Sequence, residues 1–244
     1  MSVFVGTSGW DYPEWRGHFY PEDLSRTRFL RYYADVFGSC ELNATFRGRQ
    51  TERSVARWFE STPNDFVFCA KAHMRITHRK QMTPDAETRA FMAEFIASLS
   101  GLGNKLGVVL LQIPAFRERD DDGLASLLDA LPSGPRYAFD FRHDSWDHSG
   151  VRQLLAEAKA GSCLADDSGD APGSVMQGRF GYIRLRASGY TDEQRQAWLR
   201  LLRNEGTNGD LFVFARHKGI DPGANSAGVD LASWLQRRLA EEKT

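Results

Sequence analysis

The 244-residue sequence contains only three cysteines, and no two of them form a CxxC pair. Cys40, Cys69 and Cys163 each lie in or beside an apolar segment, a setting that favours small buried core residues over metal ligands or disulfides. No stretch is long and apolar enough for a signal peptide or a membrane span. We therefore expect a reduced, cytoplasmic protein with no membrane partner.

An excess of charge of either sign is also missing. The chain has 31 lysines and arginines against 32 aspartates and glutamates, so its formal net charge is -1. This balance argues against a chain-wide electrostatic footprint for nucleic acid or for an anionic membrane. Any anion-binding site in this protein must be local.

Several motifs of common enzyme classes do not occur. There is no GxSxG elbow, no P-loop and no HExxH pair, which disfavours nucleophilic hydrolases and nucleoside triphosphatases. The segment GLGNKLG has the wrong spacing for a dinucleotide fingerprint and precedes a predicted strand instead of following one. We also find no internal repeat and no interdomain linker. The sequence predicts no cofactor, and one domain that covers residues 1–244.

What the chain does have is eight short apolar segments, most of them separated by stretches with helical spacing. Each ends in polar residues, and in order they read VFVGTSGW, CELNATF, FVFCAKAH, GVVLLQIP, YAFDFRH, CLADD, YIRLR and LFVFARH. This pattern predicts an α/β protein, a single (β/α)8 TIM-barrel-like domain whose site lies at the carboxyl ends of the strands. The segment DDSGDAPGSVMQG looks irregular, so we expect the outer helix after strand six to be degraded or missing.

Alternation along each strand indicates which side chains enter the barrel. In the fifth segment the bulky aromatic residues belong under the helices, which leaves Asp140 and Arg142 in the lumen near its upper end. The same reasoning gives a mouth that is net positive, because its predicted cations outnumber its predicted anions. The cations are Lys71, Arg142, Arg184, Arg186 and Arg216, and the anions are Glu41, Asp140 and Asp166.

Six segments carry a family likeness over essentially the whole chain: GTSGWDYPEWRGHFYP, ELNATF, FVFCAKAHMRITH, LGVVLLQIP, FDFRHDSW and YIRLR. They resemble the YecE-like family, also called domain of unknown function family 72. The resemblance implies a TIM-barrel-like fold and brings no established activity. Departures from the family pattern cluster at the mouth and suggest an altered ligand preference or drift of the site. They are Arg47, Gln50, Asp140, Arg186, Arg216 and His217.

The first functional hypothesis is an enzyme that acts on an anionic or phosphorylated small molecule, or on a sugar, by acid-base chemistry. Its candidate catalytic residues are Glu41, Asp140 and Lys71. The candidate substrate-binding residues are Trp10, Tyr12, Asn43, His73, Gln112, Arg142, His143, Trp146 and Arg184. The glycine-rich GIDPGANSAG segment after strand eight lies where many barrels bind phosphate.

Three other interpretations stay open. A metal-dependent barrel enzyme, isomerase-like or phosphodiesterase-like, would use ligand types such as His73, His78 and His143, although five nearby cations would repel a divalent ion and we expect no metal. A noncatalytic module for RNA or a modified nucleotide would use the basic loop HMRITHRK with the aromatic first loop. Finally, the mouth charges could simply satisfy one another in a buried network.

Overall fold

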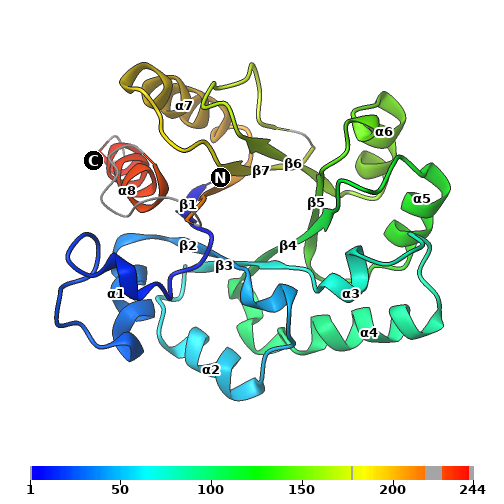
Figure 1. Cartoon of the computed structure of the whole chain (residues 1–244), viewed down its shortest axis with the longest axis horizontal. Helices are drawn as coiled ribbons and strands as arrows, with labels where there is room; N and C mark the ends of the chain where they lie inside the picture. Colours follow the sequence, from blue (N-terminus) through cyan, green and yellow to red (C-terminus); the bar gives the residue numbers. More distant parts are fainter. Residues whose placement is uncertain (1, 177, 218–226, 242–244) are drawn as a thin grey trace.

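Eight parallel strands roll into a nearly closed barrel with helices around it (Figure 1). The computed structural model describes residues 2–176, 178–217 and 227–241. The strands are β1 Val3–Thr7, β2 Ser39–Leu42, β3 Val67–Lys71, β4 Leu106–Ile113, β5 Arg136–Phe141, β6 Gly161–Asp166, β7 Phe180–Leu185 and β8 Asp210–Ala215. All eight match the apolar segments of the sequence, so the predicted barrel is confirmed.

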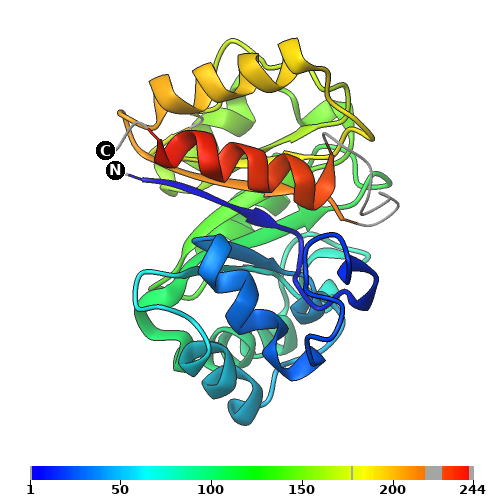
Figure 2. The ribbon, with the colours of Figure 1, turned by 90° about the vertical axis from the view of Figure 1, so that its left-hand side faces the viewer.

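Helices follow seven of the eight strands in the described part of the chain. They are α1 Phe29–Val36, α2 Glu52–Glu60, α3 Met74–Thr77, α4 Ala86–Ala97, α5 Asp121–Asp129, α6 Ser149–Glu157, α7 Asp192–Glu205 and α8 Gly228–Ala240. Short 3-10 turns lie at Pro13–Trp15, Arg26–Arg28, Ala44–Phe46, Ser100–Lys105 and Asp144–Trp146. As predicted, the described residues between β6 and β7 form no helix. Figure 2 shows α8 beside α7, packed over β1 and β8.

The second strand is shorter than the sequence pattern suggested. We expected alternation to continue through Thr45 and Phe46, but β2 ends at Leu42 and the chain turns into a 3-10 helix. The hydroxyl of Thr45 lies within hydrogen-bonding distance of the carbonyl oxygens of Leu42, at 2.7 Å, and Lys71, at 2.6 Å, and shares its one proton between them. A local side-chain bond of this kind competes with the strand ladder and ends it.

Two apolar layers are separated by the sheet, as alternation predicts. The inner layer fills the barrel and consists of Val67, Cys69, Val108, Leu110, Ala138, Phe180, Tyr182, Phe212 and Phe214, with Phe4 and Cys163 beside them. The outer layer, which includes Phe68, Val109 and Phe139, packs under the helices. The lumen is therefore a packed core, and only its upper end is left for polar groups.

The seam between β1 and β2 is closed by a side chain instead of by a strand ladder. The sheet order places these two strands at opposite ends of the ladder. The backbone N–H of Thr7 donates to the hydroxyl of Tyr33 at 2.8 Å, and that hydroxyl donates to the carbonyl oxygen of Ser39 at 3.0 Å. The strands come very close, since a Cβ atom at Gly6 would lie 2.0 Å from the Ser39 carbonyl oxygen.

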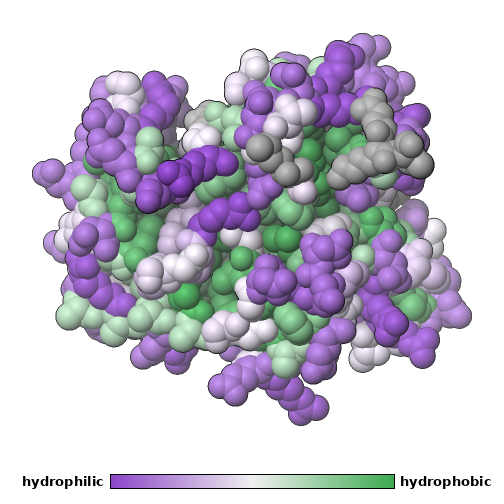
Figure 3. Space-filling view, turned by 180° about the vertical axis from the view of Figure 1, so that it is seen from behind, coloured by the Kyte–Doolittle hydropathy of each residue, from purple (hydrophilic) through white to green (hydrophobic). Residues whose placement is uncertain are grey.

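The opposite end of the barrel is capped by Arg136. Its guanidinium lies over the ring of Phe212, 4.7 Å from the centroid, and it pairs with Asp210 at 2.9 Å. Figure 3 views the molecule from that side, where hydrophilic side chains project and hydrophobic ones lie in the hollows between them. Among the described helices, none combines the length and the hydropathy needed to cross a membrane.

Candidate functional site

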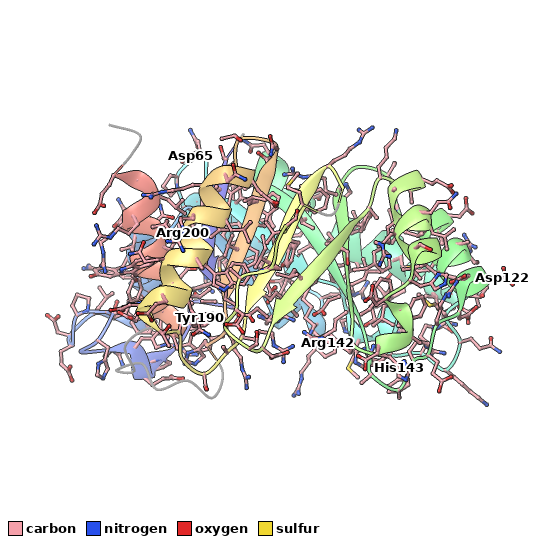
Figure 4. The ribbon with its side chains drawn as sticks, turned by 90° about the horizontal axis from the view of Figure 1, so that it is seen from above. Asp65, Asp122, Arg142, His143, Tyr190 and Arg200 are labelled. Carbon is pink, nitrogen blue, oxygen red and sulfur yellow. The ribbon has the colours of Figure 1, made fainter. Side chains whose placement is uncertain are left out.

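The polar ends of the strands gather on the face of the barrel that Figure 1 shows from the front. In Figure 4, Arg142, His143 and Tyr190 lie along one edge of the molecule, whereas Asp65, which precedes β3, lies at the opposite edge. This separation follows from the parallel sheet, because all strands start on one face and end on the other. We call the face at the carboxyl ends of the strands the mouth.

Glu41, Asp140, Arg142 and Arg184 form one connected group, which we call the mouth cluster. Arg184 lies between the two carboxylates: Nη2 donates to Oε1 of Glu41 and Nη1 donates to Oδ2 of Asp140, both at 3.0 Å. Nη2 of Arg142 donates to the same Asp140 oxygen at 2.6 Å. The cluster joins β2, β5 and β7 across the lumen, and alternation correctly placed these side chains inside.

The carboxylates of the mouth cluster are deeply buried and the guanidiniums lie nearer to solvent. The side chains of Glu41 and Asp140 are 0% and 1% exposed, against 17% for Arg142 and 13% for Arg184. Burial raises the pKa of Asp140, although both arginines oppose this shift. Burial alone would lower the pKa of Arg184, but Glu41 and Asp140 raise it above its ordinary value, so this guanidinium stays charged.

Two further polar groups complete the hydrogen bonds of Glu41. The hydroxyl of Tyr182 donates to Oε2 at 2.8 Å, and the amide of Asn43 donates to Oε1 at 3.1 Å. Asn43 was a predicted site residue. Tyr182 was not, although it lies two residues before Arg184 on β7 and therefore faces the same side of the sheet. A buried tyrosine hydroxyl needs a partner, and that requirement is the signal that could have found it. Gln112 is half-buried and lies opposite Asp140 in the β4–β5 register.

Lys71, the last residue of β3, points into the mouth beside the cluster. Its Nζ lies 4.0 Å from the centroid of the Phe46 ring. Desolvation, and then the charge of Arg184, lower the pKa of this ammonium to about 8. The sequence predicted Lys71 at this position but gave no indication of the ring beneath it, because Phe46 reaches the site only through the unexpected 3-10 turn.

Trp10 and Tyr12 lie beside the cluster on the loop after β1. Together with Glu41 and Asn43 they line a cavity of about 500 Å³ between this loop, the end of β2 and α2. Trp10 packs edge-on against Trp58, with ring centroids 5.7 Å apart. The structure therefore brings the predicted aromatic residues next to the mouth cluster, on its β2 side.

His73, His143 and Trp146 have other surroundings. The Nδ1 atoms of His73 and His143 accept backbone N–H groups two residues further on and cap short helical turns. Trp146 is buried, and its indole N–H donates to the carbonyl oxygen of Arg117 at 2.8 Å. His143 and Trp146 line a second cavity of about 310 Å³, which also borders Cys163 between β5 and β6.

His217 makes contacts that sequence reasoning did not anticipate. It follows β8, and its Nδ1 accepts the indole N–H of Trp15 at 2.9 Å while its Nε2 lies 3.1 Å from a carboxylate oxygen of Glu14. Its ring also stacks on Tyr12, with centroids 3.6 Å apart. Burial lowers the pKa of His217. The residue therefore fixes the aromatic loop of β1 to the end of β8.

The remaining predicted mouth charges are used locally or lie elsewhere. Asp166 accepts the backbone N–H of Gly169 at 2.8 Å and the hydroxyl of Tyr190 at 2.7 Å, which shapes the loop after β6. Arg186 pairs with Asp167 at 3.5 Å. Most of the GIDPGANSAG segment, which we expected to bind phosphate, lies outside the described residues. The described histidines, cysteines and carboxylates form no group of three or more suited to holding a metal ion.

The profile of the family described as "Protein of unknown function DUF72" matches residues 4–244. The chain belongs to the DUF72 family. The resemblance read from the sequence motifs is therefore confirmed, and it extends through all eight strands of the barrel. The mouth cluster and the aromatic loop of β1 are thus features of a DUF72 protein.

Two curated proteins show the relationship at the level of sequence. The UPF0759 protein YecE of Escherichia coli K12 is 30% identical over 152 residues, which are 62% of this chain and 52% of YecE. YunF of Bacillus subtilis 168, also a UPF0759 protein, is 28% identical over 153 residues, 59% of this chain and 52% of YunF. The chain spans about half the length of the curated relatives it matches.

Solved structures show the same fold. A DUF72 family protein from Thermotoga maritima MSB8 has a TM-score of 0.77 at 21% identity, covering 98% of this chain and 100% of that one. A DUF72 family protein from Enterococcus faecalis V583 gives 0.75 at 14% identity, over 98% and 96%. SacUVDE gives 0.56 at 9% identity, over 100% of both chains. At these identities the likeness concerns the fold alone.

Proposed function

We propose that this DUF72 protein is an enzyme that binds a small molecule with a carboxylate or phosphate group at the mouth and transfers protons on it. The observation that supports the proposal best is the burial order of the mouth cluster. Its carboxylate side chains are almost fully buried and its arginine side chains are partly exposed, so the members of the cluster that solvent reaches are positive. Lys71 adds a further cation beside the cluster.

Hydrogen-bond donors without acceptors give a second line of support. Nε of Arg142 and Nη1 of Arg186 are buried and have no hydrogen-bond partner among the described residues. A buried donor that lacks an acceptor costs about 1–3 kcal/mol. The described residues hold other buried polar atoms of this kind, such as Ser39 Oγ and Arg195 Nε, so these two donors support the proposal through their position beside the cluster. A small anion that shifted either guanidinium slightly would satisfy these donors.

The proposed roles follow from what each group already contacts. Arg142 and Arg184 would hold the anionic group by charge-assisted hydrogen bonds. Glu41 and Asp140 already accept hydrogen bonds from these guanidiniums and would act as positioning residues that keep them oriented. Lys71, with a pKa of about 8, would carry the proton, because a general acid or base works best when its pKa is near the working pH.

The test is isothermal titration calorimetry, which measures the affinity of the protein for inorganic phosphate and for glycerol 3-phosphate. We expect Arg142→Gln to weaken binding about tenfold or more, the loss typical of one charge-assisted contact. Arg136→Gln is the matched control, since it removes an arginine at the opposite end of the barrel. Equal affinity in the wild type and Arg142→Gln, or an equal loss in both variants, would contradict an anion site at the mouth.

A further inference from the structure

The amine of Lys71 forms no ion pair with the carboxylates beside it among the described residues. Its Nζ makes no hydrogen bond and no ion pair with any described residue, although Glu41 and Asp140 lie close enough to influence its charge. The reason is competition. Arg184 bridges both carboxylates, while Tyr182 and Asn43 take the remaining positions on Glu41. Lys71 thus lies beside two carboxylates that already bind Arg184, and its amine has no hydrogen bond to any described residue.

A second lysine shows how this chain holds a buried ammonium for structural purposes. Nζ of Lys105 donates to the carbonyl oxygens of Phe59 and Thr62 at 2.6 and 2.8 Å and to the Thr62 hydroxyl at 3.1 Å. Those contacts satisfy all three protons and tie Lys105 to the end of α2. Both ammonium groups lie over an aromatic ring, Lys105 at 4.1 Å and Lys71 at 4.0 Å, but Lys71 makes none of these hydrogen bonds with the described residues.

The surroundings of the Lys71 amine favour its unprotonated form more than water does. Its pKa of about 8, set by desolvation and then by Arg184, leaves about a tenth of it unprotonated at pH 7, several hundred times the fraction of an ordinary lysine. An unprotonated amine next to cations is the arrangement in which lysine acts as a nucleophile toward carbonyl groups. The Phe46 face, 4.0 Å from Nζ, would stabilise a cation formed at that nitrogen.

We propose that Lys71 forms an imine with a small aldehyde or ketone that carries an anionic group. This inference rests on the proposed function and names the substrate class for the same mouth. The Nζ lone pair attacks the carbonyl carbon, the carbonyl oxygen takes up a proton, and the nitrogen loses one to give a carbinolamine. The hydroxyl takes up a proton from solvent and leaves as water, which gives the protonated imine. The sum is amine plus carbonyl plus one proton giving protonated imine plus water, without an oxidant or reductant.

The experiment traps this imine with cyanoborohydride and maps the modified peptides. Only six lysines occur in the sequence, and two exposed ones, Lys80 and Lys159, provide internal controls. With glyoxylate near pH 7 we expect modification of Lys71 about tenfold or more faster than of either control. Its rate should level off above about pH 8, whereas the controls keep gaining reactivity toward about pH 10.

A parallel reaction with formaldehyde, which has no charge, separates this inference from the proposed function. One outcome supports both the nucleophilic lysine and the anion site. In it, both reagents label Lys71 selectively, and Arg142→Gln slows only the reaction with glyoxylate. Selective labelling by formaldehyde alone upholds the nucleophilic lysine and contradicts the anion site. If Lys71 reacts no faster than Lys80 and Lys159 with either reagent, the inference is overturned, even where the phosphate titration succeeds. Far-ultraviolet circular dichroism of Lys71→Arg, which must lose the Lys71 label, checks that the fold is kept.

Discussion

Replacing Arg184 with methionine is expected to lower the free energy of unfolding by about 3–5 kcal/mol at neutral pH, the cost typical of breaking a buried ion pair from one side. The side chain neutralises two carboxylates that are 0% and 1% exposed. Without it, Asp140 keeps only Arg142, and Glu41 keeps only neutral donors. Urea unfolding followed by circular dichroism would measure the loss.

The same variant has a pH signature with a definite sign. Burial already raises the pKa of Asp140, and loss of Arg184 would raise it further. A carboxyl whose folded-state pKa is raised destabilises the fold above that pKa and stops doing so as pH falls below the ordinary unfolded value. The deficit of Arg184→Met relative to the wild type should therefore shrink between about pH 7 and about pH 4.

Arg152→Met is the control, because its ion pair with Asp147 is largely exposed and should contribute less than about 1 kcal/mol. A deficit of Arg184→Met that stays constant with pH would show that the arginine matters through packing and not through its charge. A deficit no larger than that of Arg152→Met would mean that the mouth cluster contributes little to folding.

Gly6→Ala is expected to lower the melting temperature by about 6 °C or more, which corresponds to a loss of about 3 kcal/mol or more in a chain of this size. The added Cβ would lie 2.0 Å from the carbonyl oxygen of Ser39 and 2.9 Å from the hydroxyl of Tyr33. The first clash is with backbone, so relief requires β1 and β2 to move apart, which would also break the bonds made by Tyr33.

Gly38→Ala is the matched control on the other side of the seam, next to Ser39. A Cβ there meets nothing within 4 Å, and Gly38 does not have a positive φ. This variant should melt close to the wild type, as thermal unfolding by differential scanning calorimetry would show. If Gly6→Ala melts within about 1 °C of Gly38→Ala, the strands tolerate separation and the close approach at Gly6 does not stabilise the barrel.

The barrel itself could be predicted from sequence because its signals are local. Strand alternation assigns each side chain to the lumen or to the helix layer, and it placed Asp140, Arg142 and Arg184 correctly in the lumen. The lack of a helix among the described residues between β6 and β7 was equally predictable, because that segment carries no helical spacing. These features depend on neighbours a few residues away, so a single chain is enough to reveal them.

The partners within the mouth were not predictable in the same way. Arg184 takes both carboxylates because β2, β5 and β7 meet across the lumen, and that distance appears nowhere in the sequence. His73 and His143 were candidate ligand-binding residues, yet each ring caps a helical turn two residues away. Capping occupies a histidine nitrogen that a ligand could otherwise bind, and neither the residue type nor the alternation along a strand reveals it.

The seam held by Tyr33 bears on how this chain avoids aggregation. A sheet whose first and last strands are not laddered together has two free edges, and free edges recruit strands from other molecules. Here the two edges face each other, and the Tyr33 hydroxyl uses the Thr7 N–H and the Ser39 carbonyl that a foreign strand would otherwise bind. One hydroxyl group thereby occupies a donor on one edge and an acceptor on the other, and the Cys40 thiol adds a contact to the Thr7 carbonyl oxygen at 3.6 Å.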